Sequence, residues 1–377
     1  MLSCGEASGD LYAGALIRAL NARESVEVFG FGGDQMRAAG ADMVGDYRGF
    51  SVTGLTEALS VVRRSWAMLG TLTGTARDRR PDVFVALDFP DFNFRLLPRI
   101  RALGIPIVYY ISPQLWAWRP GRLKTIKKYV DRMLVIFPFE EAIYRDAGIP
   151  VTFVGHPLID IAIPQRSRET TCRAAGLDPS KPVVALLPGS RPNELRLLTP
   201  VLLEAARRLS SSLPGVQFLV ARAPSLDDEL FAGLEGLRSD GVPLGVVSDS
   251  ADDVLTAADV VVTASGTATV QTALHGKPMV IVYRVSPLTY AIGKRVVTLP
   301  HYGMVNLVSG RAIVTELIQD DCTPERVSEE TRILLTDQAR ASVMRKDLTE
   351  VVRRLGGAGA SERAAEAVLS TARTREE

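Results

Sequence analysis

The stretch from Asp259 to Val282 constrains the fold more than any other part of this chain. Its apolar run, Val260 to Thr263, has the length and β-branching of a buried parallel strand. A turn of small residues at 264–267 leads into a helical segment at 268–275, and Gly276 stands where a helix C-cap glycine belongs. A second apolar run follows. This order predicts a βαβ unit whose turn can bind a phosphate, although any small-residue turn before a helix has the same pattern.

Strand-and-helix units of this kind recur along the whole chain. One series runs from Met1 to Val154 and a second begins at Pro182, with a polar, proline-containing hinge at 163–171 between them. Because 377 residues exceed one ordinary core, two domains are expected. The sequence predicts an α/β protein with two Rossmann-like domains, at 1–160 and 161–345. C-terminal helices at 346–377 are expected to pack back on the first domain.

Composition excludes several classes of protein. The net charge of +1 gives no general attraction to nucleic acid or membranes, and no apolar run reaches the length of a spanning helix. The start, MLSCGEASGD, has no signal peptide, so a cytoplasmic location is expected. Cys4, Cys172 and Cys322 are odd in number and far apart, which favours buried thiols. The three histidines are also scattered, and no metal site is expected.

Four loops at predicted strand ends carry the candidate chemistry. In the second series, the loops at 188–191 and 264–267 have the glycines and the arginine, Arg191, that suit a nucleotide diphosphate. In the first series, GEASGD at 5–10 and DFPDFN at 88–93 also follow strands. Asp88 and Asp91 are candidate general bases, and turn or N-cap roles remain open for both.

A basic and aromatic region lies between the first-series loops and the hinge. Residues 55–72 place an apolar stripe on one helix face beside Arg63 and Arg64, which suits either core packing or an acyl- or membrane-facing patch. From Arg95 to Arg132 there are nine Lys or Arg against one acid, with Trp116 and Trp118 between them. A solvated face and a nucleic-acid site are the alternatives, but a cationic pocket for a phosphorylated, lipid-like substrate fits better.

Eight motifs occur in an order that resembles the lipid-A-disaccharide synthase family along nearly the whole chain. They are GEASGD at 5–10, DFPDFN at 88–93, SPQLWAWR at 112–119, GH at 155–156, LPGSR at 187–191, ASGTAT at 264–269, YR at 283–284 and NLVSGR at 306–311. The resemblance implies an inverting, metal-independent glycosyltransferase of GT-B architecture, with two Rossmann-like domains and a cleft between them. No cofactor is implied.

The resemblance also implies the reaction and its partners. UDP-2,3-diacylglucosamine would donate its sugar to 2,3-diacylglucosamine 1-phosphate, giving UDP and the β-1,6-linked lipid A disaccharide 1-phosphate. The expected location is the inner face of the inner membrane, as a peripheral protein, with no nucleic-acid partner; a homodimer is left open. Two alternatives remain: a UDP-N-acetylglucosamine 2-epimerase-like isomerase and a non-catalytic nucleotide-sugar-binding protein.

Residue roles follow from the same resemblance. Asp88 corresponds to the base on the acceptor hydroxyl. The expected donor-binding residues are Gly189, Ser190, Arg191, Ser265, Gly266, Thr267, Gln271, Arg284 and Asn306. The expected acceptor-binding residues are Glu6, Ser8, Asp91 and Asn93. The expected membrane or acyl contacts are Arg63, Arg64, Trp66, Leu69, Trp116 and Trp118.

Two positions depart from the family pattern. The family commonly has a glutamate where this chain has Gln271, which puts the usual ribose contact in doubt because a neutral amide accepts through one oxygen only. The first strand is also short, with only Met1 to Cys4 before the Gly5 turn. A longer natural N-terminus with several more apolar residues is therefore expected.

Overall fold

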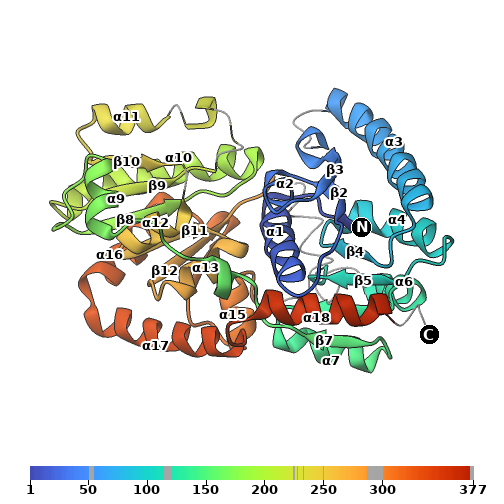
Figure 1. The fold of residues 1–377 in the computed structure, drawn as a ribbon. Helices are drawn as coiled ribbons and strands as arrows, with labels where there is room; N and C mark the ends of the chain where they lie inside the picture. Colours follow the sequence, from blue (N-terminus) through green and yellow to red (C-terminus); the bar gives the residue numbers. More distant parts are fainter. Residues whose placement is uncertain are drawn as a thin grey trace. The chain divides into compact units, whose positions relative to one another are not determined.

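The computed structural model describes residues 1–50, 55–113, 120–223, 226, 228–231, 233–248, 250–286, 290 and 300–373. They form two compact units (Figure 1). The first contains Met1–Ile161 and the C-terminal segment from Leu355, and the second contains Ala162–Arg354. Helix α17 (Gln338–Arg354) therefore belongs to the second unit, and the chain returns to the first unit only after it.

The first unit is built on a seven-stranded parallel sheet. Its strand order is β3-β2-β1-β4-β5-β6-β7. The strands are β1 (Leu2–Ser3), β2 (Phe29–Gly32), β3 (Asp42–Asp46), β4 (Phe84–Leu87), β5 (Ile107–Tyr110), β6 (Arg132–Val135) and β7 (Val151–Phe153). The central strands are buried on both faces, as a parallel sheet between helices requires.

Helices cover both faces of this sheet. They are α1 (Ala7–Asn21), α2 (Asp34–Ala38), α3 (Leu55–Arg79), α4 (Pro90–Arg101), α6 (Leu123–Tyr129), α7 (Pro138–Asp146), α8 (Leu158–Ile161) and α18 (Ala360–Arg373), with 3₁₀ turns at Tyr47–Phe50 and Pro120–Arg122. One core cluster gathers aromatic and aliphatic side chains from the strands, α3 and α4, among them Phe84 and Tyr109.

The second unit repeats the architecture with six parallel strands in the order β10-β9-β8-β11-β12-β13. They are β8 (Val183–Leu187), β9 (Gln217–Ala221), β10 (Leu244–Val247), β11 (Val260–Ala264), β12 (Met279–Tyr283) and β13 (Thr315–Ile318). The helices are α9 (Arg168–Ala174), α10 (Pro192–Ser212), α11 (Gly233–Ser239), α12 (Ala251–Ala257), α13 (Thr267–Leu274), α15 (Met304–Ser309), α16 (Pro324–Thr336) and α17, with 3₁₀ turns at Asp228–Phe231 and Gln319–Asp321.

These two sheets confirm the predicted α/β class with two Rossmann-like halves. The βαβ unit predicted at 259–282 is β11-α13-β12, and Gly276 after α13 adopts the left-handed φ of 62° that its C-cap role requires. Two edge strands, β3 and β13, were not predicted. Both carry charged residues and lack the continuous apolar run of an internal parallel strand.

The Gly155-His156 motif has a structural role in the first unit. The His156 N–H donates to Leu355 O at 2.9 Å, and a Cβ at Gly155 would lie 3.2 Å from the same carbonyl oxygen. The imidazole packs against Tyr12 and Phe137, and burial lowers the pKa of His156 to about 3. The motif therefore contacts the C-terminal segment at Leu355, where this segment joins the first unit. Helix α18 then packs against α1 (Figure 1).

Asp253 plays a comparable role at the start of the second unit. Its carboxylate accepts hydrogen bonds from the backbone N–H groups of Gln165 and Arg166 at 2.7 and 2.9 Å, and from the Arg166 guanidinium at 2.7 Å. Burial alone would raise the pKa of Asp253, but these hydrogen bonds outweigh it and hold the pKa below its ordinary value. The segment leaving the predicted hinge is thus fixed to α12.

We predict that Asp253→Asn lowers the free energy of unfolding by about 2–4 kcal/mol, because an amide cannot accept three such bonds or pair with Arg166. Since the folded pKa is depressed, the stabilisation is present above about pH 4 and is lost as pH falls through the folded pKa. Urea unfolding at about pH 5 and about pH 3 should therefore show a smaller pH effect in the variant. Equal pH dependence in both proteins would contradict the assignment.

Candidate active site

The topology places the four predicted loops at two equivalent positions. In the first unit, β1 pairs with β4, and the loops at 5–10 and 88–93 leave the carboxyl ends of these two strands. In the second unit, β8 pairs with β11, and the loops at 188–191 and 264–267 leave their carboxyl ends. In each pair, the chain continues from one strand to a neighbour on one side of the sheet and from the other strand to a neighbour on the opposite side. Such a position is a topological switch point, where α/β sheets bind ligands.

Asp88 stands on a strained turn at the end of β4. Asp88 and Phe89 both adopt left-handed backbone conformations, with φ of 44° and 48°, which non-glycine residues rarely do. The Asp88 carbonyl accepts hydrogen bonds from Asn93 Nδ2 at 2.8 Å and from the Tyr109 hydroxyl at 2.7 Å. Burial raises the pKa of Tyr109 and the neighbouring Asp88 raises it further, so the hydroxyl keeps its proton and donates. These two hydrogen bonds fix the direction in which Asp88 leaves the strand.

The loop after β1 packs against the turn at Asp88 and Phe89. A Cβ added to Gly5 would lie 2.2 Å from the Phe89 ring, so only glycine fits there. Phe89 in turn stacks on Phe92 at 5.3 Å between ring centroids. Glu6 is the N-cap residue of α1 and Ser8 lies in its first turn, and both are half-buried. Gly5 therefore lets the two first-unit loops interlock beside Asp88.

The predicted acceptor-binding residues Asp91 and Asn93 differ in exposure. Asn93 is fully buried; its Oδ1 accepts from the Ser3 hydroxyl at 2.9 Å and its Nδ2 donates to Asp88 O. The structure therefore makes Asn93 a positioning residue for Asp88, which corrects the prediction of a direct substrate contact. Asp91 is exposed and pairs with Arg122 at 2.5 Å, and the guanidinium of Arg122 also lies over the Phe94 ring.

The loop after β8 is held by a carboxylate of the chain itself. Glu194 accepts from the N–H groups of Ser190 and Arg191 at 3.0 and 3.3 Å, and also contacts Arg191 Nη1 at 3.4 Å. Gly189 has a φ of 117°, and a Cβ there would lie 2.3 Å from Glu194 Oε2. The Arg191 side chain is largely exposed. In this structure the backbone donors of the loop thus bind Glu194, and Arg191 presents its guanidinium outward.

The loop after β11 differs because its helix N-terminus has no such carboxylate. In the part of the chain that the structure describes, the N–H groups of Gly266, Thr267 and Ala268 have no hydrogen-bond partner. Gly266 has a φ of 148°, and nothing lies within 4 Å of a Cβ built there. Ser265 is held within the unit, since its N–H donates to Val282 O and its hydroxyl to Tyr302 O. The free N–H groups at residues 266–268 are therefore able to donate hydrogen bonds to an anion.

Asn306 is also a structural residue and not the expected ligand contact. Its side chain is fully buried; Oδ1 accepts from the N–H groups of Ile313 and Val314, and Nδ2 donates to Val314 O and Glu316 Oε1. All four hydrogen-bonding positions of the amide are used. Glu316 also accepts from the N–H groups of Tyr302 and Gly303. The network fixes the loop before α15, close to Ser265.

Arg284 and Gln271 each have a hydrogen-bond partner within the second unit. Arg284 follows β12, and its Nε donates to Gln319 O at 3.3 Å. Gln271 lies on α13, and its Nε2 donates to Asp252 Oδ1 at 2.8 Å. The same oxygen accepts from His275 Nε2 at 2.8 Å. Gln271 is therefore part of a cluster with a carboxylate that was not predicted as a site residue.

The predicted lipid-side helix divides into two parts. Leu69 and Leu72 are fully buried in the core of the first unit, so the prediction that Leu69 contacts acyl chains or membrane is wrong. Val62 and Trp66 are exposed, at 49% and 53%, and the two arginines between them are also exposed. The guanidinium groups of two arginines of α4 approach the Trp66 ring within 5.9 and 5.6 Å of its centroid. We call this group of six residues the α3–α4 surface: Val62, Arg63, Arg64, Trp66, Arg95 and Arg99.

Trp116 and Trp118 lie outside the described residues. The buried, unpaired state predicted for Cys4, Cys172 and Cys322 is confirmed. Among the described residues, no His, Cys, Asp and Glu side chains are grouped as metal ligands. Within the same part of the chain, no helix has both the length and the apolar character needed to span a bilayer.

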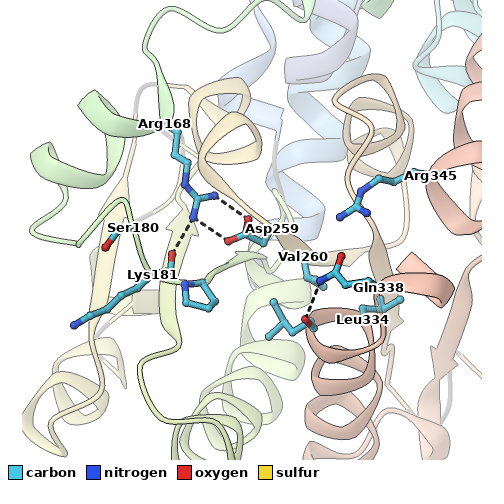
Figure 2. A pocket seen from close by; sticks show the side chains of 10 residues that line it. Arg168, Ser180, Lys181, Asp259, Val260, Leu334, Gln338 and Arg345 are labelled. Atoms are coloured by element: carbon cyan, nitrogen blue, oxygen red, sulfur yellow. Dashed lines mark hydrogen bonds and ion pairs between the residues drawn. The ribbon is translucent and has the colours of Figure 1, made fainter. Parts of the chain in front are cut away.

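A cavity of about 310 Å³ lies at the amino-terminal ends of the strands of the second sheet (Figure 2). It opens where β8 and β11 begin, and Arg168, Lys181, Asp259 and Arg345 are among its lining residues. Arg168 pairs with Asp259 at 2.9 Å. This cavity is separated from the two second-unit loops by the length of the strands, so it is not part of the candidate active site.

Comparison with known proteins identifies the family. The family described as "Lipid-A-disaccharide synthetase" matches residues 1–371. A protein of Geobacter metallireducens named lipid-A-disaccharide synthase is 44% identical over 373 residues, which cover 98% of this chain and 96% of the relative. The chain belongs to the lipid-A-disaccharide synthase family. It is accordingly a glycosyltransferase, as the sequence motifs predicted.

Solved structures confirm the GT-B fold. MurG of Acinetobacter baumannii aligns with a TM-score of 0.60 and 12% identity, covering 98% of both chains. A UDP-GlcNAc 2-epimerase of Neisseria meningitidis, bound to UDP-GlcNAc, aligns with a TM-score of 0.69 and 11% identity, covering 98% of this chain and 99% of that one. At such identities the likeness shows the fold alone. The epimerase alternative is therefore not favoured over the synthase family.

Three site residues were missed by sequence reasoning. Tyr109 lies inside β5 and has the sequence context of a core residue, because only the fold brings its hydroxyl to Asp88 O. Asp252 lies 19 positions before Gln271, and nothing in its local sequence distinguishes it from an N-terminal helix acid. Glu194 could have been found, since a glutamate at the third position of a helix commonly receives N–H groups at the helix start.

We predict that Gly5→Ala reduces glycosyl-transfer turnover by about a hundredfold, because the new methyl group displaces Phe89 and with it Asp88. UDP binding, measured by calorimetry, should be unchanged. Gly70→Ala is the matched control: it lies on α3 with nothing within 4 Å of its added Cβ, so turnover should be retained. Wild-type turnover in Gly5→Ala would contradict the interlocked arrangement.

Proposed function

We propose that this enzyme transfers a 2,3-diacylglucosamine unit from its UDP derivative to the 6-hydroxyl of 2,3-diacylglucosamine 1-phosphate, releasing UDP and forming a β-1,6 linkage. Membership of the family and the GT-B fold support nucleotide-sugar and lipid-sugar substrates. The observation that carries the proposal is the strained strand end at Asp88, held by Tyr109 and Asn93 at a switch point.

Asp88 is the general base in this proposal. An inverting displacement needs a base that takes the proton of the attacking hydroxyl as the bond to the anomeric carbon forms. Backbone strain at Asp88 and Phe89 costs free energy and is retained where the surrounding structure enforces it, as at many active sites. The two hydrogen bonds to the Asp88 carbonyl mean that a fixed backbone, and not a flexible loop, directs the carboxylate.

The second unit binds the leaving diphosphate. The N–H groups of residues 266–268 at the start of α13 face the growing negative charge, and the Arg191 guanidinium adds a full positive charge. These groups are proposed to stabilise the leaving group without a divalent cation. Incubation with a chelator should accordingly leave turnover unchanged, and a loss that added Mg²⁺ restores would contradict this part of the proposal.

The test of the reaction is direct. Purified protein is supplied with both acylated sugars, and the products are followed by mass spectrometry. Disaccharide 1-phosphate and UDP in equal amounts support the proposal. Epimerised UDP-sugar without disaccharide would favour the isomerase alternative, and tight UDP-sugar binding without any product would favour the non-catalytic alternative.

We predict that Asp88→Asn lowers kcat by roughly 10²–10⁴-fold, the range for loss of a general base, while UDP binding stays nearly unchanged. Asp34→Asn serves as the control, because Asp34 is an exposed carboxylate of the same unit and is 62% exposed. Undiminished turnover in Asp88→Asn would remove Asp88 from the role of base.

The α3–α4 surface is proposed to hold the enzyme at the inner face of the inner membrane. Acylated substrates are supplied from a bilayer, and an exposed tryptophan among arginines is typical of a side chain at the boundary between headgroups and acyl chains. Trp66 has this environment, with Arg95 and Arg99 near its ring and Val62 one helical turn away. Arginines around it would bind anionic headgroups.

We predict that Trp66→Ser combined with Arg63→Glu strongly reduces co-sedimentation with vesicles containing anionic phospholipid, with little change in melting temperature. The matched control is Val343→Ser, since Val343 is an equally exposed apolar side chain, at 59%, on α17. Vesicle binding that persists in the α3 variant would contradict the membrane-facing assignment.

A further inference from the structure

A hydrogen-bonded cluster in the second unit joins Asp252 of α12 to Gln271 and His275 beside α13. Asp252 Oδ1 accepts from Gln271 Nε2 and from His275 Nε2, each at 2.8 Å. Its carboxylate is 17% exposed and the imidazole is 9% exposed, so the cluster is shielded but reaches the surface. His275 Nδ1 lies 3.4 Å from the Thr256 hydroxyl.

The chemistry of these groups fixes their orientation. A carboxylate only accepts, so the nitrogen of the Gln271 amide must face Asp252 and its Oε1 must face away. For the same reason, His275 Nε2 carries its proton. Asp252 Oδ1 thus already has two donors. Among the described residues, no donor contacts Asp252 Oδ2.

Two members of the cluster, Asp252 and Gln271, lie toward the end of the second unit that carries the proposed phosphate site, and His275 follows at the C-terminal end of α13. Helix α12 follows β10, so Asp252 in its first turn stands at the carboxyl edge of the sheet. Gln271 is four residues after Thr267 on α13, which places both side chains on one face of the helix, one turn apart. A nucleotide whose diphosphate binds the start of α13 can therefore place its ribose along this face.

We propose that Asp252 Oδ2 and Gln271 Oε1 together form the acceptor pair for the vicinal ribose hydroxyls of the nucleotide donor. Asp252 is then a specificity-determining residue for a ribonucleotide, and His275 positions its carboxylate. This inference rests on the proposed function, because it needs a nucleotide at α13. It accounts for a neutral side chain at position 271: the negative charge of the ribose subsite is carried by the neighbouring helix.

Because Asp252 carries a negative charge, the arrangement can be tested by removing single hydroxyl groups from the ribose. A hydroxyl bound to a carboxylate forms a stronger hydrogen bond than one bound to a neutral amide, and loss of such a partner weakens binding by roughly tenfold to a hundredfold. An acceptor pair of this kind discriminates a ribonucleotide from its deoxy analogue because the analogue leaves the carboxylate without a donor.

The experiment measures binding of UDP and 2′-deoxy-UDP, and of 3′-deoxy-UDP, by calorimetry on the full chain. Wild type is expected to bind UDP at least about tenfold more tightly than one of the two deoxy analogues. Asp252→Asn should weaken UDP binding and bring that ratio below about threefold. Asp347→Asn is the matched control: Asp347 is 18% exposed and ion-paired on α17 of the same unit, and its variant should keep the ratio.

An exchange variant separates the binding role from a structural one. Asp252→Asn with Gln271→Glu restores one amide-to-carboxylate hydrogen bond but moves the charge to α13. We expect this double variant to recover the preference for UDP over the deoxy analogue. The double variant also serves if Asp252→Asn alone does not fold, because it keeps a hydrogen bond between positions 252 and 271. A recovered preference for UDP supports the acceptor pair, and a lost preference overturns it.

Each remaining outcome is decisive. If wild type prefers UDP and Asp252→Asn prefers it equally, the inference is overturned while the donor site stands. If wild type binds UDP and both deoxy analogues equally, no ribose acceptor pair exists and the inference is overturned. If wild type does not bind UDP at all, the proposed donor site fails, and this inference fails with it.

Discussion

Carboxylates that accept hydrogen bonds from backbone N–H groups hold the loops of this structure in place. Parallel strands buried on both faces must end in loops whose N–H groups lie partly out of water, and each such group needs a partner. Asp10 accepts from Gly33, Gln35 and Met36 in the first unit. Glu316 does the same for the loop before α15. A charged acceptor shared by several N–H groups fixes a loop more firmly than single neutral bonds would.

The distribution of these carboxylates also indicates where an external anion can bind. The N–H groups after β8 bind Glu194, whereas those at the start of α13 have no partner among the described residues. Two loops that look alike in the sequence are therefore unequal. A phosphate bound at α13 would take the place that a side-chain carboxylate takes elsewhere, and Arg191 would contribute its side chain rather than its backbone.

The sequence predicted most of the architecture because the internal strands are apolar runs, and the run predicted from Val260 to Thr263 forms β11. It also predicted the loops, since motifs at strand ends can be recognised directly. It failed for Asn93 and Asn306, whose polar side chains suggested ligand contact but are buried and fully engaged within their own units. It failed for Leu69 because helical periodicity shows which residues share a face and not which face is covered.

What the sequence determined by itself was local: the succession of strands and helices, the glycines that turns require, and the motifs that indicate the family. Tertiary structure alone decided which polar groups remain available to a ligand, because hydrogen bonds between distant residues use up some and leave others. Tyr109 reaches the Asp88 carbonyl only because β5 pairs with β4. Asp252 meets Gln271 only because the fold brings α12 and α13 together in one unit. Because the fold decides which hydrogen-bonding groups pair with one another, sequence patterns cannot show which groups remain free to bind a ligand.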